Sequence, residues 1–75
     1  IGHSAKVGDF SFVSTNSTLC GSVQLGKSSY VGVNSAIKEN VVVAANTLIG
    51  MGALITKDIV EEGKTYLAGV NKVRS

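Results

Sequence analysis

Residues 19–55 read LCGSVQ LGKSSY VGVNSA IKENVV VAANTL IGMGAL I, with an aliphatic residue at the start of every group of six. The same register extends back through Val13 and Val7 to Ile1, so that ten successive starting positions are aliphatic. Val, Ile and Leu make up only 21 of the 75 residues. A chance match of all ten positions therefore has odds on the order of one in 10⁵. The pattern indicates hexapeptide repeats up to Ile55.

The other positions of the repeat support this interpretation. The residue after each aliphatic residue is usually small, with Lys38 and Thr56 as the exceptions. The fifth position is small or β-branched throughout, so its side chain can also pack near the inside of a tight coil. Corners need left-handed backbone conformations, which Asn and Gly adopt readily. Such residues recur at the fourth position, at Asn16, Asn34, Asn40, Asn46 and Gly52.

A period of six excludes an amphipathic helix and the plain alternation of a long strand. It fits short strands joined by sharp turns, in which three repeats make one triangular coil of about 18 residues with the aliphatic residues inside. We therefore predict an all-β chain, a parallel β-helix with coils at residues 1–18, 19–36 and 37–54. Beyond them the period fails. Residues 57–64 read as a polar loop and residues 65–68 as a further short strand in a C-terminal cap.

Composition excludes several classes of function. Seven basic and five acidic residues give a net charge of +2, without the dense basic surface that nucleic acids or anionic membranes attract. The longest apolar run, residues 41–45, is far shorter than the roughly 20 residues that span a bilayer. A single cysteine, Cys20, permits no intrachain disulfide and fits a reducing compartment. We expect a cytoplasmic protein without nucleic-acid or membrane partners.

Length sets a further limit. A globular chain of this size buries only about 60% of its unfolded surface and is marginal when alone. Ile1 already occupies a repeat position, so we expect residues 1–75 to be one domain of a longer protein. We also expect a homotrimer, because three short coils cannot bury enough apolar surface alone and because Val33 and Met51 leave an apolar edge outside the coil.

Five stretches of the chain resemble a known family, and together they span nearly all of it. They are Ile1-Gly2-His3, Val7-Gly8-Asp9-Phe10, Gly21-Ser22-Val23-Gln24-Leu25-Gly26, Ile49-Gly50-Met51-Gly52-Ala53 and Ile55-Thr56-Lys57-Asp58. They resemble the hexapeptide-repeat acyltransferases, and within them the sialic-acid O-acyltransferase group, which includes bacterial nucleotide-sugar N-acetyltransferases. The resemblance implies a left-handed β-helix, a homotrimer with active sites between subunits, and a nucleotide-sugar domain upstream of Ile1 that this chain lacks.

The resemblance also implies an activity. It predicts an acetyl-CoA-dependent acetyltransferase in which a sugar or nucleotide-sugar amine or hydroxyl attacks the thioester directly. His3, the only histidine, resembles the family's general base, a role that histidine fills more often than any other side chain. The family commonly has an acidic residue next to this histidine, whereas this chain has Ser4. The alternative for His3 is an ordinary surface histidine at a corner.

Stacking supports the same site. Residues 18 apart lie in one column, so Gly21 lies above His3 and leaves room for a ligand, unless it is an ordinary corner glycine. By position, Val33, Met51, Thr56 and Lys57 resemble the family's coenzyme A contacts. Thr15 shares a column with Val33 and Met51, which predicts an apolar groove for a pantetheine arm or, alternatively, a subunit interface. Lys57 fits either a phosphate or a solvated face.

Other functions remain to be weighed. A non-catalytic β-helix used for trimerisation or scaffolding is the main alternative, and coenzyme A binding would distinguish it. A zinc hydratase of the same fold needs three histidine ligands, whereas this chain has one histidine, so we expect no metal. An ice-binding surface needs aligned threonines, but Thr15, Thr18, Thr47 and Thr56 fall in four different columns.

Overall fold

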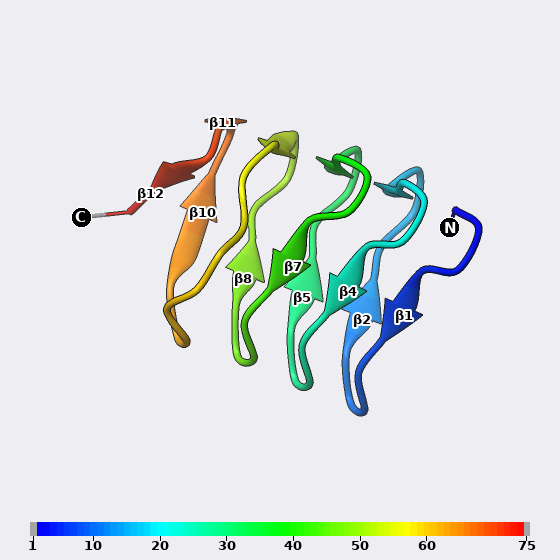
Figure 1. The fold of residues 1–75 in the computed structure, drawn as a ribbon. Helices are drawn as coiled ribbons and strands as arrows, with labels where there is room; N and C mark the ends of the chain where they lie inside the picture. The colour runs from blue at the N-terminus through cyan, green and yellow to red at the C-terminus, as the bar shows by residue number, and fades with distance from the viewer. Residues whose placement is uncertain (1, 75) are drawn as a thin grey trace.

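The computed structural model describes residues 2–74, which form short strands and turns. They wind through about four coils into a parallel β-solenoid with Cα extents of 32 × 20 × 20 Å (Figure 1). The predicted fold class is confirmed. Ile1 lies outside the described residues, and with it the prediction that its side chain points inward. Within residues 2–74 there is no helix of the length and apolarity needed to cross a membrane.

Three sheets form the sides of a triangular prism, which we name face A (β1-β4-β7), face B (β2-β5-β8-β10-β12) and face C (β3-β6-β9-β11). The strands of face A are β1 (Lys6–Val7), β4 (Gln24–Leu25) and β7 (Val42–Val43). Those of face B are β2 (Phe12–Val13), β5 (Tyr30–Val31), β8 (Leu48–Ile49), β10 (Thr65–Leu67) and β12 (Lys72–Val73). Those of face C are β3 (Thr18–Leu19), β6 (Ala36–Ile37), β9 (Ala53–Ile55) and β11 (Gly69–Val70).

The register between coils is regular. On face A, Lys6 pairs with Gln24 and Gln24 pairs with Val42, so each strand lies over the strand 18 residues earlier. Backbone bonds join each coil to the next, as where the N–H of Lys6 donates to the carbonyl of Val23 at 2.8 Å. The predicted columns of residues 18 apart are therefore confirmed through the third coil.

The winding is left-handed. In Figure 1, strands β1, β4 and β7 lie in front and run downward, while β2, β5 and β8 run upward behind them. The coils advance from right to left in the same view. A rotation of that sense combined with that advance makes a left-handed screw, opposite to the usual hand of parallel crossovers.

The first position of the repeat forms the core, as predicted, from the second coil onward. Every aliphatic residue of this set from Leu19 to Ile55 is at most 3% exposed. Val13 is half-buried, and Val7 is 39% exposed because no strand among residues 2–74 covers the outer side of β1. The core therefore weakens toward the N-terminal end of the stack.

The fifth position also lies inside, where its hydroxyl groups bond to neighbouring coils. Ser35 Oγ donates to the carbonyl of Gly50 at 2.6 Å. Ser29 Oγ accepts from the N–H of Thr47 at 3.2 Å, and the N–H of Ser29 donates to Ser11 Oγ at 3.0 Å. Ser29, Ser35 and Thr47 are at most 2% exposed. Buried hydroxyl groups are thus satisfied, which avoids the cost of an unpaired polar group in the core.

The fourth position of each six-residue repeat from Ser4 to Gly52 has a positive φ, which turns the chain at the corners. The asparagines and the glycine predicted for this role adopt it, for example Asn34 (φ 60°) and Gly52 (φ 73°). Less expected residues do so as well: Ser4, Phe10, Ser22 and Ser28. Phe10 is 92% exposed with φ 61°, a conformation that costs roughly 1–2 kcal/mol for most L-residues.

A fourth coil follows the three predicted ones, and it departs from the repeat. Ile59 forms a bridge with Val43, 16 residues earlier, and is 1% exposed. Strand β10 pairs with β8, β11 pairs with β9, and β12 then folds back antiparallel on β10. The strand predicted at residues 65–68 is confirmed as β10. The prediction that residues 57–64 form a polar loop is wrong for Ile59, which is part of the core.

Candidate functional site

The three faces meet at three edges, each formed by the third position of the repeat. Bonds between successive coils define the columns, as where the N–H of Ser22 donates to the carbonyl of His3 at 2.9 Å. The N–H of Gly52 likewise donates to the carbonyl of Val33 at 2.9 Å. The His3 edge holds His3, Gly21 and Glu39; the Asp9 edge holds Asp9, Lys27 and Ala45; the Met51 edge holds Thr15, Val33 and Met51.

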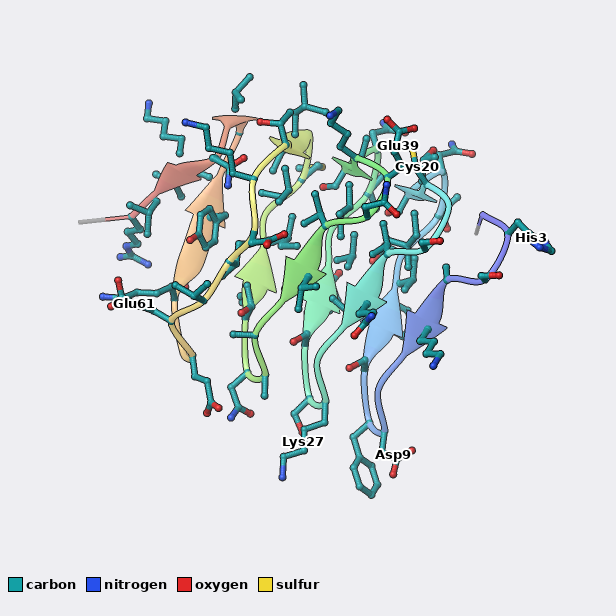
Figure 2. The ribbon with its side chains drawn as sticks, in the orientation of Figure 1. His3, Asp9, Cys20, Lys27, Glu39 and Glu61 are labelled. Atoms are coloured by element: carbon teal, nitrogen blue, oxygen red, sulfur yellow. The ribbon has the colours of Figure 1, made fainter. Side chains whose placement is uncertain are left out.

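His3 lies at the outer end of its edge. Its side chain is exposed and projects away from the stack near the N-terminus (Figure 2). Gly21 lies above it, and a Cβ on Gly21 would come no closer than 3.4 Å to the His3 carbonyl oxygen. The left-handed residue of that corner is Ser22 (φ 60°). The backbone therefore does not require glycine at position 21, and the space beside His3 is open.

In the coil next to His3, the same edge holds Gly21, which has no side chain that could orient the imidazole. Ser4 occupies a left-handed corner position (φ 61°) directly after His3. The acidic residue of this edge, Glu39, lies two coils away, which is about 10 Å along the axis (Figure 2).

The Met51 edge presents apolar side chains and free donors together. Met51 is 69% exposed and Val33 is half-buried in the coil below. Among residues 2–74, the backbone N–H groups of Val33 and Met51 donate no hydrogen bond. Stacked coils lie about 4.8 Å apart. The edge therefore offers two amide donors, one coil apart, beside an apolar surface.

Thr56 and Lys57 are arranged differently from that edge. Asn71 Oδ1 accepts from the N–H of Thr56 at 2.7 Å and from the N–H of Lys57 at 3.1 Å. Asn71 Nδ2 donates to the carbonyl of Lys57 at 3.2 Å. The Thr56 hydroxyl also donates to Asn71 Oδ1 at 3.3 Å, so of the two residues only Lys57 has a side chain that is free for a ligand. The Lys57 side chain is exposed.

Asn71 is the residue of this region that the sequence did not identify. It has a positive φ of 44°, as Gly69 does at 121°. An asparagine two residues after a glycine is typical of a turn. That signal predicts a bend in the chain, but it does not predict a contact with residues 14 and 15 positions earlier.

The sequence-predicted residues do not converge in a single chain. Face C separates the His3 edge from the Met51 edge, because β3 and β6 each run from the latter to the former. Lys57 follows two residues after Ile55, which pairs with Ile37, and is therefore near the upper end of the His3 edge. Residues 2–74 enclose no pocket, and no three of their His, Cys, Asp or Glu side chains group as metal ligands.

Comparison with known proteins adds no assignment. No model of a protein family matches the chain. No curated protein matches it either. The evidence bearing on function is therefore the fold, the two edges and the chemistry of the residues on them.

Proposed function

We propose that this chain is the coenzyme A-binding β-helix of an acetyl-CoA-dependent acyltransferase. The acceptor is an amine or hydroxyl of a sugar or nucleotide sugar, and the working unit is a homotrimer with its sites between subunits. The observation that supports this most is the apolar surface of Val33 and Met51 at the Met51 edge. It lies beside two backbone N–H groups that donate no hydrogen bond among residues 2–74, as is true of the third-position N–H groups on the other edges too.

A pantetheine arm matches that edge in chemistry and in length. It is an extended chain that alternates apolar carbons with two amide groups, whose carbonyls accept hydrogen bonds. Val33 and Met51 provide apolar contacts, and their N–H groups point to successive positions about 4.8 Å apart. An N–H near the thioester would stabilise the negative charge that develops on its oxygen during attack.

His3 supplies the base. Its exposed imidazole is accessible to an acceptor approaching from solvent. In the proposed step it takes the proton of the attacking amine or hydroxyl, whose nitrogen or oxygen forms a bond to the thioester carbon. The carbon–sulfur bond then breaks, and the departing thiolate of coenzyme A takes up a proton. One subunit provides His3 and the next provides the Met51 edge, because these edges are apart in one chain.

Substitution of His3 tests the proposal. General base catalysis contributes roughly 10²- to 10⁴-fold. In the intact protein, His3→Ala should therefore lower turnover by about that factor while leaving coenzyme A affinity nearly unchanged. The lower end of the range is expected because Ser4 replaces an acidic neighbour. Asp9→Ala is the matched control, since Asp9 holds the same repeat position on another edge and should leave turnover within about twofold.

The proposal is contradicted if His3→Ala keeps more than about a third of the turnover at saturating acetyl-CoA. Such a result excludes a general-base loss of this size. The second candidate is a non-catalytic scaffold, which the β-solenoid fits equally well. Calorimetric titration of the intact protein with coenzyme A separates the two, because a scaffold has no reason to bind it.

A further inference from the structure

The Tyr30 side chain is held in place from two sides on face B. Tyr30 in β5 pairs with Phe12 in β2, and both side chains face outward, 41% and 58% exposed (Figure 1). Their rings stack with centroids 5.5 Å apart and an interplanar angle of 14°. Ser14 Oγ donates to the Tyr30 hydroxyl oxygen at 3.0 Å. A stacked ring and a hydrogen bond therefore fix the position of this hydroxyl group.

The proton of the Tyr30 hydroxyl is available to a ligand. Among residues 2–74, this hydroxyl accepts from Ser14 but donates to no acceptor. Ser14 is only 9% exposed, whereas Tyr30 is open to solvent over part of its surface. The phenol group thus presents a donor whose oxygen is already fixed. Such a donor needs no reorganisation when negative charge develops next to it.

The Tyr30 hydroxyl lies at the first-coil end of the Met51 edge. Ser14, its hydrogen-bond partner, directly precedes Thr15, which is the first-coil residue of that edge. Tyr30 itself belongs to the second coil, so its side chain leans toward the N-terminal end of the stack. Met51 is two coils above Thr15, which is about 10 Å along the axis. The Tyr30 hydroxyl and the Met51 N–H group therefore serve different heights of one edge.

His3 belongs to the first coil as well. In the proposed function, His3 of one subunit lies beside the Met51 edge of the next. Two such edges lie side by side along their length when the coil axes are parallel, and rotation about a parallel axis leaves each residue at its own height. The base then meets the first-coil end of the Met51 edge. A thioester at that height is nearer to the Tyr30 hydroxyl than to the Met51 N–H group, which is about 10 Å higher.

The surface around the Tyr30 hydroxyl is uncharged. Residues 10–19 and 28–37, which form the first two coils of face B and of the Met51 edge, contain no Asp, Glu, Lys or Arg. A negative charge that develops there meets no carboxylate and no cation from these residues. Neutral donors must therefore stabilise it, and donors that are fixed beforehand do so best.

We propose that Tyr30 is a catalytic residue whose hydroxyl donates a hydrogen bond to the thioester oxygen during attack. This inference rests on the proposed function. As the acceptor nitrogen or oxygen bonds to the thioester carbon, the carbonyl electron pair moves onto the oxygen and His3 takes the proton of the acceptor. The pair then returns, the carbon–sulfur bond breaks, and the thiolate of coenzyme A takes that proton from His3. Tyr30 keeps its own proton throughout, and Ser14 is a positioning residue that acts through the Tyr30 hydroxyl.

Tyr30→Phe removes the hydroxyl and keeps the stacked ring, so it separates the donor from the packing. The intact protein is assayed by release of free thiol from acetyl-CoA, with glucosamine as the sugar amine. Loss of one such donor costs about 10²- to 10³-fold in kcat, and we expect about 10²-fold because Tyr30 is 41% exposed. The Kd of coenzyme A, from calorimetric titration, should stay within about twofold, since the hydrogen bond strengthens in the transition state.

Tyr66→Phe is the matched control for loss of a phenol hydroxyl. Tyr66 is half-buried in β10, near the opposite end of face B, and its substitution should leave kcat within about twofold. Ser14→Ala should lower kcat by about tenfold. The double variant Tyr30→Phe/Ser14→Ala should be no slower than Tyr30→Phe, because Ser14 then has no hydroxyl to orient. Urea denaturation checks that each variant is folded.

The outcomes separate this inference from the proposed function. Tyr30→Phe with more than about a third of the unsubstituted kcat at saturating acetyl-CoA overturns the role of Tyr30. Equal losses from Tyr30→Phe and Tyr66→Phe overturn it as well. If Ser14→Ala lowers kcat by the same factor with and without the Tyr30 hydroxyl, Ser14 does not act through Tyr30. An unsubstituted protein that does not bind coenzyme A, or that binds acetyl-CoA without releasing thiol, contradicts the proposed function itself, and the inference falls with it.

Discussion

The two ends of the stack differ in how well their core residues are covered. At the N-terminal end of residues 2–74, Val7 in β1 is 39% exposed, and among these residues β1 pairs with β4 alone. At the C-terminal end, the chain folds β12 back on β10 and buries Ile55 and Ile59 completely or nearly so. A regular repeat makes every coil ready to receive another coil. In residues 2–74, the core stays covered at the end where the repeat is broken.

Substitution of Ile59 should have the largest effect on this contrast. Ile59→Ala removes a side chain that is 1% exposed beneath the cap and should lower the free energy of unfolding by about 2–5 kcal/mol. Urea denaturation of the intact protein measures it. Val60→Ala is the matched control, since Val60 is the next residue and is 83% exposed; a loss of about 0.5 kcal/mol or less is expected there. Equal losses from the two variants would mean that Ile59 does not close the core.

A pair of identical substitutions compares the ends directly. Val7 and Val43 lie in one column of face A, but Val43 is 2% exposed and Val7 is 39% exposed. Val43→Ala should cost about 2 kcal/mol of unfolding free energy, and Val7→Ala less than about 1 kcal/mol, in proportion to the apolar area each buries. The same denaturation measurement decides it. If Val7→Ala costs as much as Val43→Ala, β1 is covered in the intact protein.

Asn71 sharpens the comparison at the closed end. Asn71→Ala removes the acceptor of the Thr56 and Lys57 N–H groups and should cost about 1–2 kcal/mol. Hydrogen exchange should show faster exchange at these two amides. Asn71→Asp keeps the carboxyl oxygen as acceptor and should retain most of their protection. Unchanged exchange in Asn71→Ala would show that the side chain does not hold this segment.

The smallest expected effect is a gain at the open end. Phe10 is 92% exposed in a left-handed conformation, which asparagine adopts at lower cost. Phe10→Asn should therefore raise the free energy of unfolding by about 0.5–1 kcal/mol. Phe10→Leu serves as the control, because leucine has the same backbone cost as phenylalanine. If Phe10→Asn and Phe10→Leu had equal free energies of unfolding, backbone strain at position 10 would not explain the gain.

The regular part of the fold could be predicted because it follows from local periodicity. The period of six indicated which residues are buried from Leu19 to Ile55, and the columns 18 apart are confirmed. The two ends of the stack of coils could not be predicted in this way. Ile59 is one aliphatic residue within a charged segment, and it reaches the core only because its coil is shorter by two residues. Val7 repeats the same pattern as Val43 but lacks a lower neighbour.

The candidate site was predictable column by column, but not as an assembled site. Spacing placed Gly21 above His3, and Met51 above Val33, as the structure has them. It could not indicate that these columns lie on different edges with a sheet between them, since that relation matters only when several chains are considered. The role of Asn71 depends on the hydrogen bond that its side chain accepts from the N–H of Thr56, 15 residues earlier. A local sequence pattern does not predict such a contact. The activity itself stays a prediction.

The bonds between coils also determine how the molecule responds to force. They run along the axis of the stack, because each coil donates to the coil above it and accepts from it. A pulling load along this axis falls on one interface at a time, so coils should detach singly from an end. Each detached coil of about 18 residues would release roughly 60 Å of extended chain. Extension by an optical trap would then rise in regular steps, and the shorter fourth coil would give a step of a different length.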